Sequence, residues 1–196
     1  MCDFKSYISL LANIDQDHLE RHENMLDYLS IKLKIFKSSK FSILNKSLLE
    51  TYQSKIEIDD KYLYGVADSN VLVNNKIINE ISYDSSTLYF NKNFDLAHRG
   101  THNLENILGV CSVAEILKID IIECLRSLIS YTYLPHRIEL VRSFKNIDWY
   151  NDSKSTNSAS TQVALEYLDN NVILIMGGAK KNIDYKPLSP LIDQKV

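Results

Sequence analysis

The sequence is poor in residues that break a chain or cross-link it. Of its 196 residues, 3 are proline, 5 are glycine and 3 are cysteine, which excludes a disulfide-stapled scaffold and a proline- or glycine-rich linker. Cys2, Cys111 and Cys124 are odd in number and lack the spacing of metal ligands. We therefore expect reduced, buried thiols in a cytoplasmic protein.

Long apolar runs and an excess of one charge are also absent. No run approaches the roughly 20 apolar residues that a membrane helix needs, and the N-terminus MCDFKSYISL shows no signal peptide. The chain balances 22 basic against 25 acidic residues, for a formal net charge of -3. No overall field therefore attracts nucleic acid or an anionic membrane. The sequence predicts a soluble globular protein with no nucleic-acid partner and no membrane insertion.

Apolar periodicity organises the first two thirds of the chain. Residues 7–14 form a short branched run, typical of a buried strand, and residues 23–39 carry apolar side chains at helical spacing. Short alternating pieces follow, which we interpret as strands and hairpins at 41–45, 61–67, 70–83 and 86–96. Residues 101–119 and 119–131 return to helical spacing. This order indicates a mixed α/β domain.

A break at Leu134-Pro135 marks the predicted domain boundary, because proline interrupts the helical pattern. Beyond it we expect a hairpin at 137–150, a helix at 157–170, and a buried strand in VILIM (172–176) that runs into a glycine turn. The β-α-β order is typical of a nucleotide-binding, Rossmann-like sheet.

One polar stretch, WYNDSKSTN (149–157), lies between a predicted strand and a predicted helix, where open α/β sheets bind ligands. Asp152 could accept from ribose hydroxyls, Lys154 could hold an anion, and Thr156 or Ser158 could cap the helix. The competing interpretation is that Asp152, Thr156 and Asn157 are ordinary turn and capping residues. The stretch alone leaves both interpretations open.

Two further clusters carry basic groups. GGAKKN (177–182) combines two glycines, which let backbone amides approach a ligand, with the charges of Lys180 and Lys181. LPHR (134–137) ends in an arginine fork suited to phosphate or carboxylate. Each is also compatible with a solvated turn.

Amides and histidines supply the remaining candidates. Asn103 and Asn106 lie on one face of a helix start and could recognise a purine edge, although capping explains one of them. His18 and His22 are four residues apart, but no third ligand supports a zinc site. Lys32 lies on or near an apolar stripe. Most such lysines extend their charge to solvent, whereas a buried one could react as a free amine.

Six of these segments occur in an order that resembles the Mur ligase family. They are NIDQDHLERH, YLSIKLKIF, GTHNLENILGV, LPHRIELV, WYNDSKSTN and LIMGGAKKNIDY. The resemblance implies an ATP-dependent amide ligase that passes through an acyl phosphate, with Mg²⁺ as metal. The form of NDSKSTN and LPHR resembles members that add D-glutamate to UDP-N-acetylmuramoyl-L-alanine in peptidoglycan synthesis. A sister ligase adding another amino acid is the alternative.

The resemblance also implies roles for individual residues. His18 resembles a magnesium ligand, and Lys32 the lysine that carbon dioxide carbamylates, which turns a cation into an anionic oxygen ligand suited to a hard metal. His136 and Arg137 resemble residues of the catalytic centre, Arg137 facing phosphate. The nucleotide contacts would be Asn103 and Asn106 on adenine and Asp152 on ribose, and the D-glutamate contacts would be Lys154, Thr156 and Lys181.

The glycine-rich phosphate loop of the family, which ends in Gly-Lys-Ser/Thr, has no counterpart in the sequence. We therefore expect an α/β chain made of an incomplete central, ATPase-type domain (1–134) and an incomplete C-terminal, Rossmann-like domain (135–196). We also expect the chain to be inactive alone, and to act with a separately encoded N-terminal half if it acts at all, because ATP would lose its main anchor. A non-catalytic, adenosine-binding fragment is the alternative.

Overall fold

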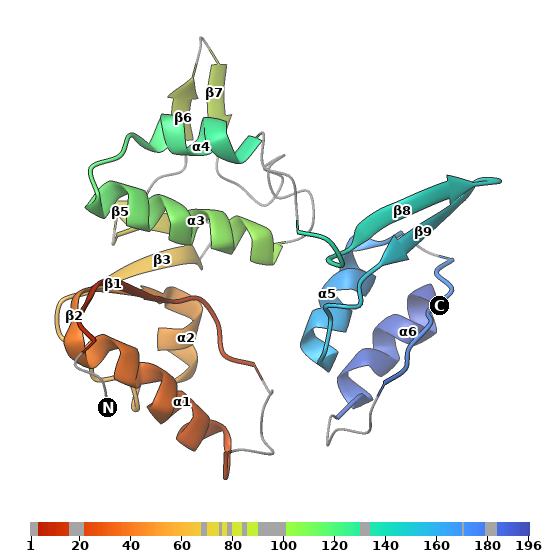
Figure 1. Cartoon of the computed structure of the whole chain (residues 1–196), viewed down its shortest axis with the longest axis horizontal. Helices are drawn as coiled ribbons and strands as arrows, with labels where there is room; N and C mark the ends of the chain where they lie inside the picture. The colour runs from red at the N-terminus through yellow and green to blue at the C-terminus, as the bar shows by residue number, and fades with distance from the viewer. Residues whose placement is uncertain are drawn as a thin grey trace. The chain divides into compact units, whose positions relative to one another are not determined.

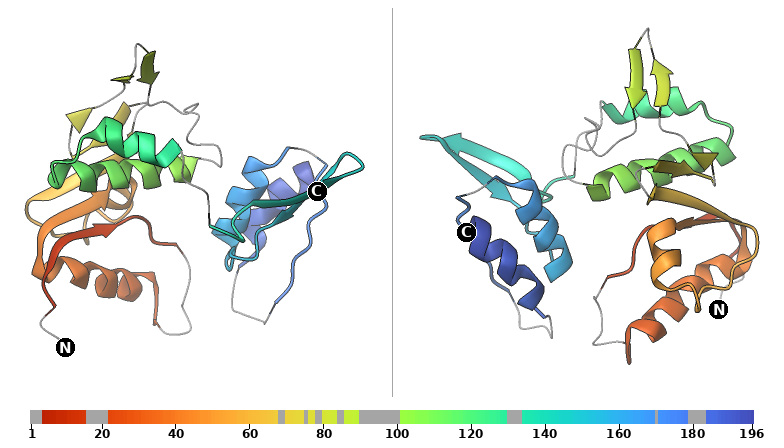
Figure 2. Two further views of the ribbon diagram at one scale, coloured as in Figure 1. Left: turned by 45° about the horizontal axis from the view of Figure 1, so that its top comes forward. Right: turned by 180° about the vertical axis from the view of Figure 1, so that it is seen from behind.

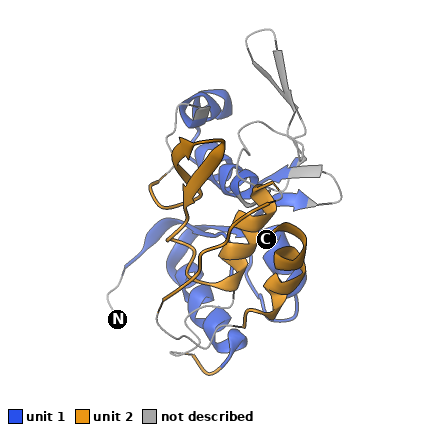
Figure 3. Ribbon diagram, turned by 90° about the vertical axis from the view of Figure 1, so that its right-hand side faces the viewer, with its two compact units in different colours: residues 1–14, 24–131 blue, residues 15–23, 132–196 orange. Residues whose placement is uncertain are grey.

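The computed structural model describes residues 4–15, 22–67, 70–74, 76–77, 80–83, 86–89, 101–129, 134–169, 171–178 and 184–196. The chain divides into two compact units, coloured separately in Figure 3. Unit 1 comprises Met1–Ile14 and Asn24–Tyr131, and unit 2 comprises Asp15–Glu23 and Thr132–Val196. The division after Tyr131 lies just before the predicted boundary at Leu134, whereas the sequence placed residues 15–23 in the first domain.

Unit 1 is built on a five-stranded sheet with the order β1-β2-β3-β4-β5. The strands β1 (Ser6–Leu11), β2 (Ser39–Asn45) and β3 (Lys61–Ala67) are parallel, and β4 (Asn70–Val73) and β5 (Lys76–Ile77) continue the sheet antiparallel. The crossovers contain α1 (Met25–Leu33), η1 (Lys34–Ser38) and α2 (Lys46–Thr51). The predicted α/β class is thus confirmed.

The first crossover shows how the sequence sets local structure. Asn24 caps α1 by accepting from the backbone N–H groups of Leu26 and Asp27, at 2.9 and 3.0 Å. Asp27 in the first turn and Lys32 in the last turn suit the helix dipole. The single helix predicted over 23–39 is shorter than expected, because its last turn tightens into the 3₁₀ helix η1 before β2 begins.

Both faces of this sheet are covered, and Figures 1 and 2 show the layers. Alternate residues of β2 serve the two faces, because Ile43 packs under α3 (Thr101–Ile116) and Leu44 packs with α1 and α2. Gly109 of α3 allows a close approach, since a Cβ there would lie 3.2 Å from a Tyr64 ring atom. The result is two hydrophobic clusters separated by the sheet.

The described part of unit 1 also contains β6 (Glu80–Tyr83), β7 (Ser86–Tyr89) and α4 (Ile121–Ile129), of which β6 and β7 form a hairpin. Cys111 of α3 is buried and Cys124 of α4 is half-buried, both as free thiols. Burial, with Cys124 beside it, raises the pKa of Cys111 to about 12. A thiol that stays protonated is a poor nucleophile, as expected of a structural cysteine.

Among its described residues, unit 2 contains a hairpin, two α-helices and one 3₁₀ helix. The strands β8 (Glu139–Phe144) and β9 (Ile147–Asn151) pair antiparallel, and Lys145 and Asn146 turn between them with φ of 50° and 60°. The predicted helix after them is α5 (Ser158–Tyr167), and η3 (Lys186–Leu188) and α6 (Ser189–Lys195) follow. None of the helices among the described residues is long and apolar enough to cross a membrane.

The prediction of a buried strand at VILIM was wrong. Residues 172–178 have no regular secondary structure, and the side chains of Ile173 and Ile175 are 85% and 84% exposed. A strand forms only with a neighbour to bond, and among the described residues of unit 2 the strands β8 and β9 pair with each other alone. The backbone N–H of Val172 instead donates to the carbonyl of Lys195 at 2.8 Å.

Candidate functional site

Two loops at the two ends of the β8-β9 hairpin lie together in unit 2. The loop 134–138 precedes β8, and the loop 152–155 follows β9, so the hairpin brings LPHR next to DSKS. The backbone N–H of Lys154 donates to the carbonyl of His136 at 3.1 Å, and the backbone N–H of Ile138 donates to Asp152 Oδ1 at 3.0 Å. The sequence motifs His136-Arg137 and Asp152-Ser153-Lys154 thus form one structural element, here called the junction loops.

The junction loops hold an unfavourable backbone conformation. His136 and Ile138 have φ values of 67° and 45°, in the left-handed region that non-glycine residues seldom adopt and that is unusual for β-branched isoleucine. Such strain persists only where the surrounding structure enforces it. Here Asp152 bonds the N–H of Ile138, and Lys154 bonds the carbonyl of His136.

Asp152 has both carboxylate oxygens engaged in the loop. Oδ1 accepts from the backbone N–H of Ile138, and Oδ2 accepts from the hydroxyl of Ser155. The backbone N–H of Ser155 also donates to the backbone carbonyl of Asp152 at 2.9 Å. The turn interpretation of Asp152 therefore holds. Each carboxylate oxygen has two lone pairs, however, so the half-buried Asp152 keeps the capacity to accept a further hydroxyl.

The cap of α5 agrees with the competing interpretation, which named Asn157 among the turn and capping residues. Asn157, not Thr156 or Ser158, is the N-cap, and its Oδ1 accepts from the Ser160 N–H at 2.8 Å. Asparagine is among the strongest N-caps, so it prevails over the neighbouring hydroxyls. The side chain of Thr156 is exposed, as are those of His136, Arg137 and Lys154. These side chains are accessible to a ligand.

In unit 1, the predicted amide pair lies near the start of α3. Asn103 is half-buried and Asn106 is exposed, and α3 as a whole packs against the sheet through Leu104, Leu108 and Cys111. The helix therefore presents the amides on a rigid support.

Sequence reasoning missed a buried polar cluster beside that helix, formed by Asn45, Tyr64 and Glu105. Asn45 ends β2, is 1% exposed, and accepts through Oδ1 from the N–H and the hydroxyl of Ser47, both at 2.9 Å. Its side chain also lies close enough to Tyr64 and Glu105 to lower the pKa of both groups, against the larger rise that burial causes.

This buried polar cluster links the end of the parallel strands to α3. Burial raises the pKa of Glu105, partly offset by the side chain of Asn45, and burial together with Glu105 raises the pKa of Tyr64. Gly65 fits beside it because its φ is 133° and a Cβ there would lie 3.1 Å from Asn45 Oδ1. A polar residue ending the apolar run FSILN was the available signal. Nothing in the sequence marked Glu105 as half-buried.

The predicted metal ligands are not assembled by the described residues. Lys32 is exposed, with its Nζ 5.3 Å from the centre of the Tyr28 ring, so its charge extends to solvent. His18 and Lys181 lie outside the described residues. No group of three His, Cys, Asp or Glu side chains that could hold a metal ion occurs in the described part of the chain.

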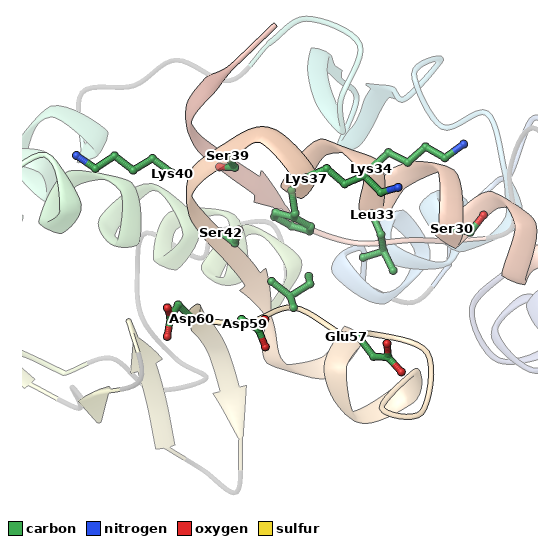
Figure 4. A pocket seen from close by; sticks show the side chains of 12 residues that line it. Ser30, Leu33, Lys34, Lys37, Ser39, Lys40, Ser42, Glu57, Asp59 and Asp60 are labelled. Atoms are coloured by element: carbon green, nitrogen blue, oxygen red, sulfur yellow. The ribbon is translucent and has the colours of Figure 1, made fainter. Parts of the chain in front are cut away.

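A pocket of about 450 Å³ in unit 1, shown in Figure 4, contains none of the predicted residues. Lys34, Lys37 and Lys40 line one side, and Asp59 and Asp60 are on the other. The pocket adjoins the beginnings of β2 and β3, whereas parallel sheets bind ligands at the carboxyl ends of their strands. We therefore place the candidate site at the other edge, with Asn45 and α3.

Comparison with known proteins adds independent evidence. The Mur ligase middle domain matches residues 1–114. The UDP-N-acetylmuramoylalanine–D-glutamate ligases of Geotalea uraniireducens and Clostridioides difficile are 31% and 34% identical, over 99% and 95% of this chain. The chain spans 44% and 42% of those relatives, less than half of their length.

The fold is also found in a solved structure. A pseudomurein peptide ligase type C from Methanothermus fervidus superposes with a TM-score of 0.62 over 85% of this chain and 42% of that one, at 17% identity. At that identity the likeness concerns the fold alone. The family match over more than half of the sequence goes further: the chain belongs to the Mur ligase family.

Proposed function

We propose that this chain is part of an ATP-dependent ligase that joins D-glutamate to UDP-N-acetylmuramoyl-L-alanine through an acyl phosphate. The names of its relatives, which match nearly the whole chain, support this activity. The observation that carries the proposal is the pair of junction loops. They place His136, Arg137, Asp152 and Lys154 on one strained, hydrogen-bonded element of unit 2.

The proposed roles follow the chemistry of each side chain. The amides of Asn103 and Asn106 would supply donors and acceptors to the adenine edge, and Asp152 would accept from a ribose hydroxyl. Arg137 would face phosphate, which a guanidinium binds in a fork. The γ-carboxylate and the α-carboxylate of D-glutamate are anions. We therefore propose Lys154, Thr156 and Lys181 as their contacts.

Ligation of this type depends on positioning and on neutralising phosphate charge. The exposed cations of the junction loops, Arg137 and Lys154, would stabilise the negative charge of the acyl phosphate. The proposed cofactors are ATP and Mg²⁺, and His18 with a carbamylated Lys32 are the proposed metal ligands. A bound magnesium ion would add charge neutralisation. The described residues alone do not form its site.

A calorimetric titration with ATP and with adenosine tests the nucleotide part of this proposal. Asn103→Ala and Asp152→Ala should each weaken binding about tenfold, the effect of losing roughly 1.4 kcal/mol. Gln162→Ala and Asp193→Ala remove an amide and a carboxylate from α5 and α6 and serve as matched controls. Equal affinity in all five proteins, or no binding in any, contradicts the assigned roles.

A further inference from the structure

Asn151, the last residue of β9, contacts a backbone group with one end of its amide and the His136 ring with the other. Its Oδ1 lies 3.1 Å from the backbone nitrogen of Ser153, and its Nδ2 lies 2.8 Å from His136 Nδ1. A backbone N–H can only donate, so the atom that faces Ser153 is the carbonyl oxygen. The atom that faces His136 is therefore the amide nitrogen, which also only donates.

This orientation decides which ring nitrogen of His136 carries the proton. A donor at 2.8 Å requires a lone pair on Nδ1. A neutral imidazole has a single N–H, so that N–H is at Nε2. The tautomer follows from the bond that Asn151 makes to Ser153 and does not depend on any bound ligand.

Glu139 is the acidic neighbour of Nδ1 and would favour a proton there. Its Oε2 lies 3.7 Å from His136 Nδ1, beyond hydrogen-bond reach. The same oxygen accepts from the backbone N–H of His136 at 2.7 Å. The backbone thus holds the Glu139 carboxylate, and the amide of Asn151 holds the ring.

We propose that Asn151 is a positioning residue that holds the neutral His136 imidazole in the Nε2-protonated tautomer, so that the ring offers its one hydrogen-bond donor to an anionic oxygen. The His136 side chain is 59% exposed, which leaves room for such an acceptor. The identity of that oxygen, a phosphate or acyl phosphate, rests on the proposed function, whereas the tautomer does not. A preorganised neutral donor stabilises developing negative charge without a reorganisation cost.

Long-range ¹H–¹⁵N NMR of the histidine rings measures the tautomer directly. The His136 signals are identified by their loss in His136→Gln, and the spectrum is recorded at about pH 8, above the ordinary imidazole range. We expect a pyrrole-like Nε2 and a pyridine-like Nδ1 in the wild-type chain. A protonated Nδ1 in that spectrum overturns the proposal, with or without any variant.

Asn151→Asp then tests whether Asn151 sets the tautomer of His136. A carboxylate still accepts from the Ser153 N–H but presents an acceptor to Nδ1, so we expect the proton to move to Nδ1. Glu139→Gln is the matched control, because Gln still accepts from the His136 backbone; it should leave the tautomer unchanged. Retention of the Nε2–H form in a folded Asn151→Asp chain contradicts the role of Asn151.

Inorganic phosphate probes the donor role separately. Addition of phosphate to the wild-type chain should shift the Nε2 resonance more than the Nδ1 resonance. If neither responds, the donor role is overturned while the tautomer assignment stands. Failure of the ATP titration would leave both ring measurements unaffected, so the two proposals can fail independently.

Discussion

The candidate groups of unit 1 and unit 2 are held in place by different means. Asn103 and Asn106 are on α3, whose inner face is buried in a hydrophobic cluster with Ile43. A second hydrophobic cluster covers the opposite face of the sheet. His136 and Lys154 are on loops whose unusual backbone is held by a few hydrogen bonds. In the described part of unit 2, the buried apolar residues are Ile138, Ala164, Leu165 and Leu188. Unit 1 is stabilised mainly by packing, and the junction loops mainly by polar contacts.

Core truncation should show the largest contrast between the units. Leu108→Ala removes a fully buried side chain between α3 and the sheet. We expect the free energy of unfolding to fall by about 3 to 5 kcal/mol. Leu165→Ala in α5, with fewer buried apolar neighbours, should lose about 2 kcal/mol, because its surroundings can collapse more easily. Urea unfolding, together with amide hydrogen exchange in each unit, measures the loss of stability in both variants. Equal losses of stability in Leu108→Ala and Leu165→Ala would contradict the expected difference between the two units.

Loss of a polar contact should matter most in the junction loops. Asp152→Ala leaves the N–H of Ile138 without its acceptor at a strained φ, and we expect a loss of about 1 to 3 kcal/mol confined to unit 2. The protection of the Ile138 amide against hydrogen exchange measures this loss of stability. Asp148→Ala, which removes an exposed bond to Ser143, is the control and should change stability by less than about 0.5 kcal/mol. A similar effect of both changes would show that Asp152 does not support the loop.

The helix caps allow the same substitution to be compared in both units. Asn24→Ala and Asn157→Ala each remove an N-cap, of α1 and of α5, and we expect losses of about 0.5 to 2 kcal/mol. The loss should be larger at Asn157, because its side chain also bonds the hydroxyl of Ser160, at 2.6 Å. Thermal unfolding monitored by residue-specific NMR distinguishes them. A larger effect at Asn24 would contradict this ranking.

The smallest expected effect is a pH dependence in the buried polar cluster. Burial raises the pKa of Glu105 above its unfolded-state value, so its contribution to stability is full below the unfolded pKa and declines as pH rises through the folded pKa. Glu105→Gln keeps an acceptor for Asn45 without the charge. We expect it to be more stable than the wild type at pH 7 to 8, with the difference vanishing towards about pH 4.

Exposed Glu123→Gln, on α4, controls for the loss of one negative charge. Thermal melts across this pH range measure both variants. A Glu105→Gln chain that is less stable than the wild type at pH 8 would show that the charged form is the one the fold prefers.

Local pattern predicted most of the elements but not every pairing. The helices at α3 and α5 and the hairpin β8-β9 follow from apolar spacing and turn residues, which act over a few positions. VILIM also has the composition of a strand, but a strand requires a neighbour, and the described residues of unit 2 offer it none. Periodicity reports propensity and not the presence of a partner.

The candidate site shows the same limit. The type and spacing of residues indicated Asp152 and Lys154, and the family resemblance indicated His136. Their bonds across the two junction loops, however, depend on the hairpin between them. Asn151 was part of the polar stretch without a role until its amide orientation was known. Glu105 was hidden in a helix pattern because burial of one carboxyl depends on Asn45 and Tyr64, which are distant in sequence.

The proposed ligase activity is tested most directly by combining this chain with the phosphate-loop-containing N-terminal portion of a related D-glutamate ligase. ADP release is then measured with UDP-N-acetylmuramoyl-L-alanine, with and without D-glutamate. We predict D-glutamate-dependent release that falls about tenfold or more in Lys154→Ala, the effect of losing roughly 1.4 kcal/mol of transition-state stabilisation, and that is unchanged in Asp193→Ala. No D-glutamate-dependent release at saturating substrates, from two folded pieces, would contradict the proposed function.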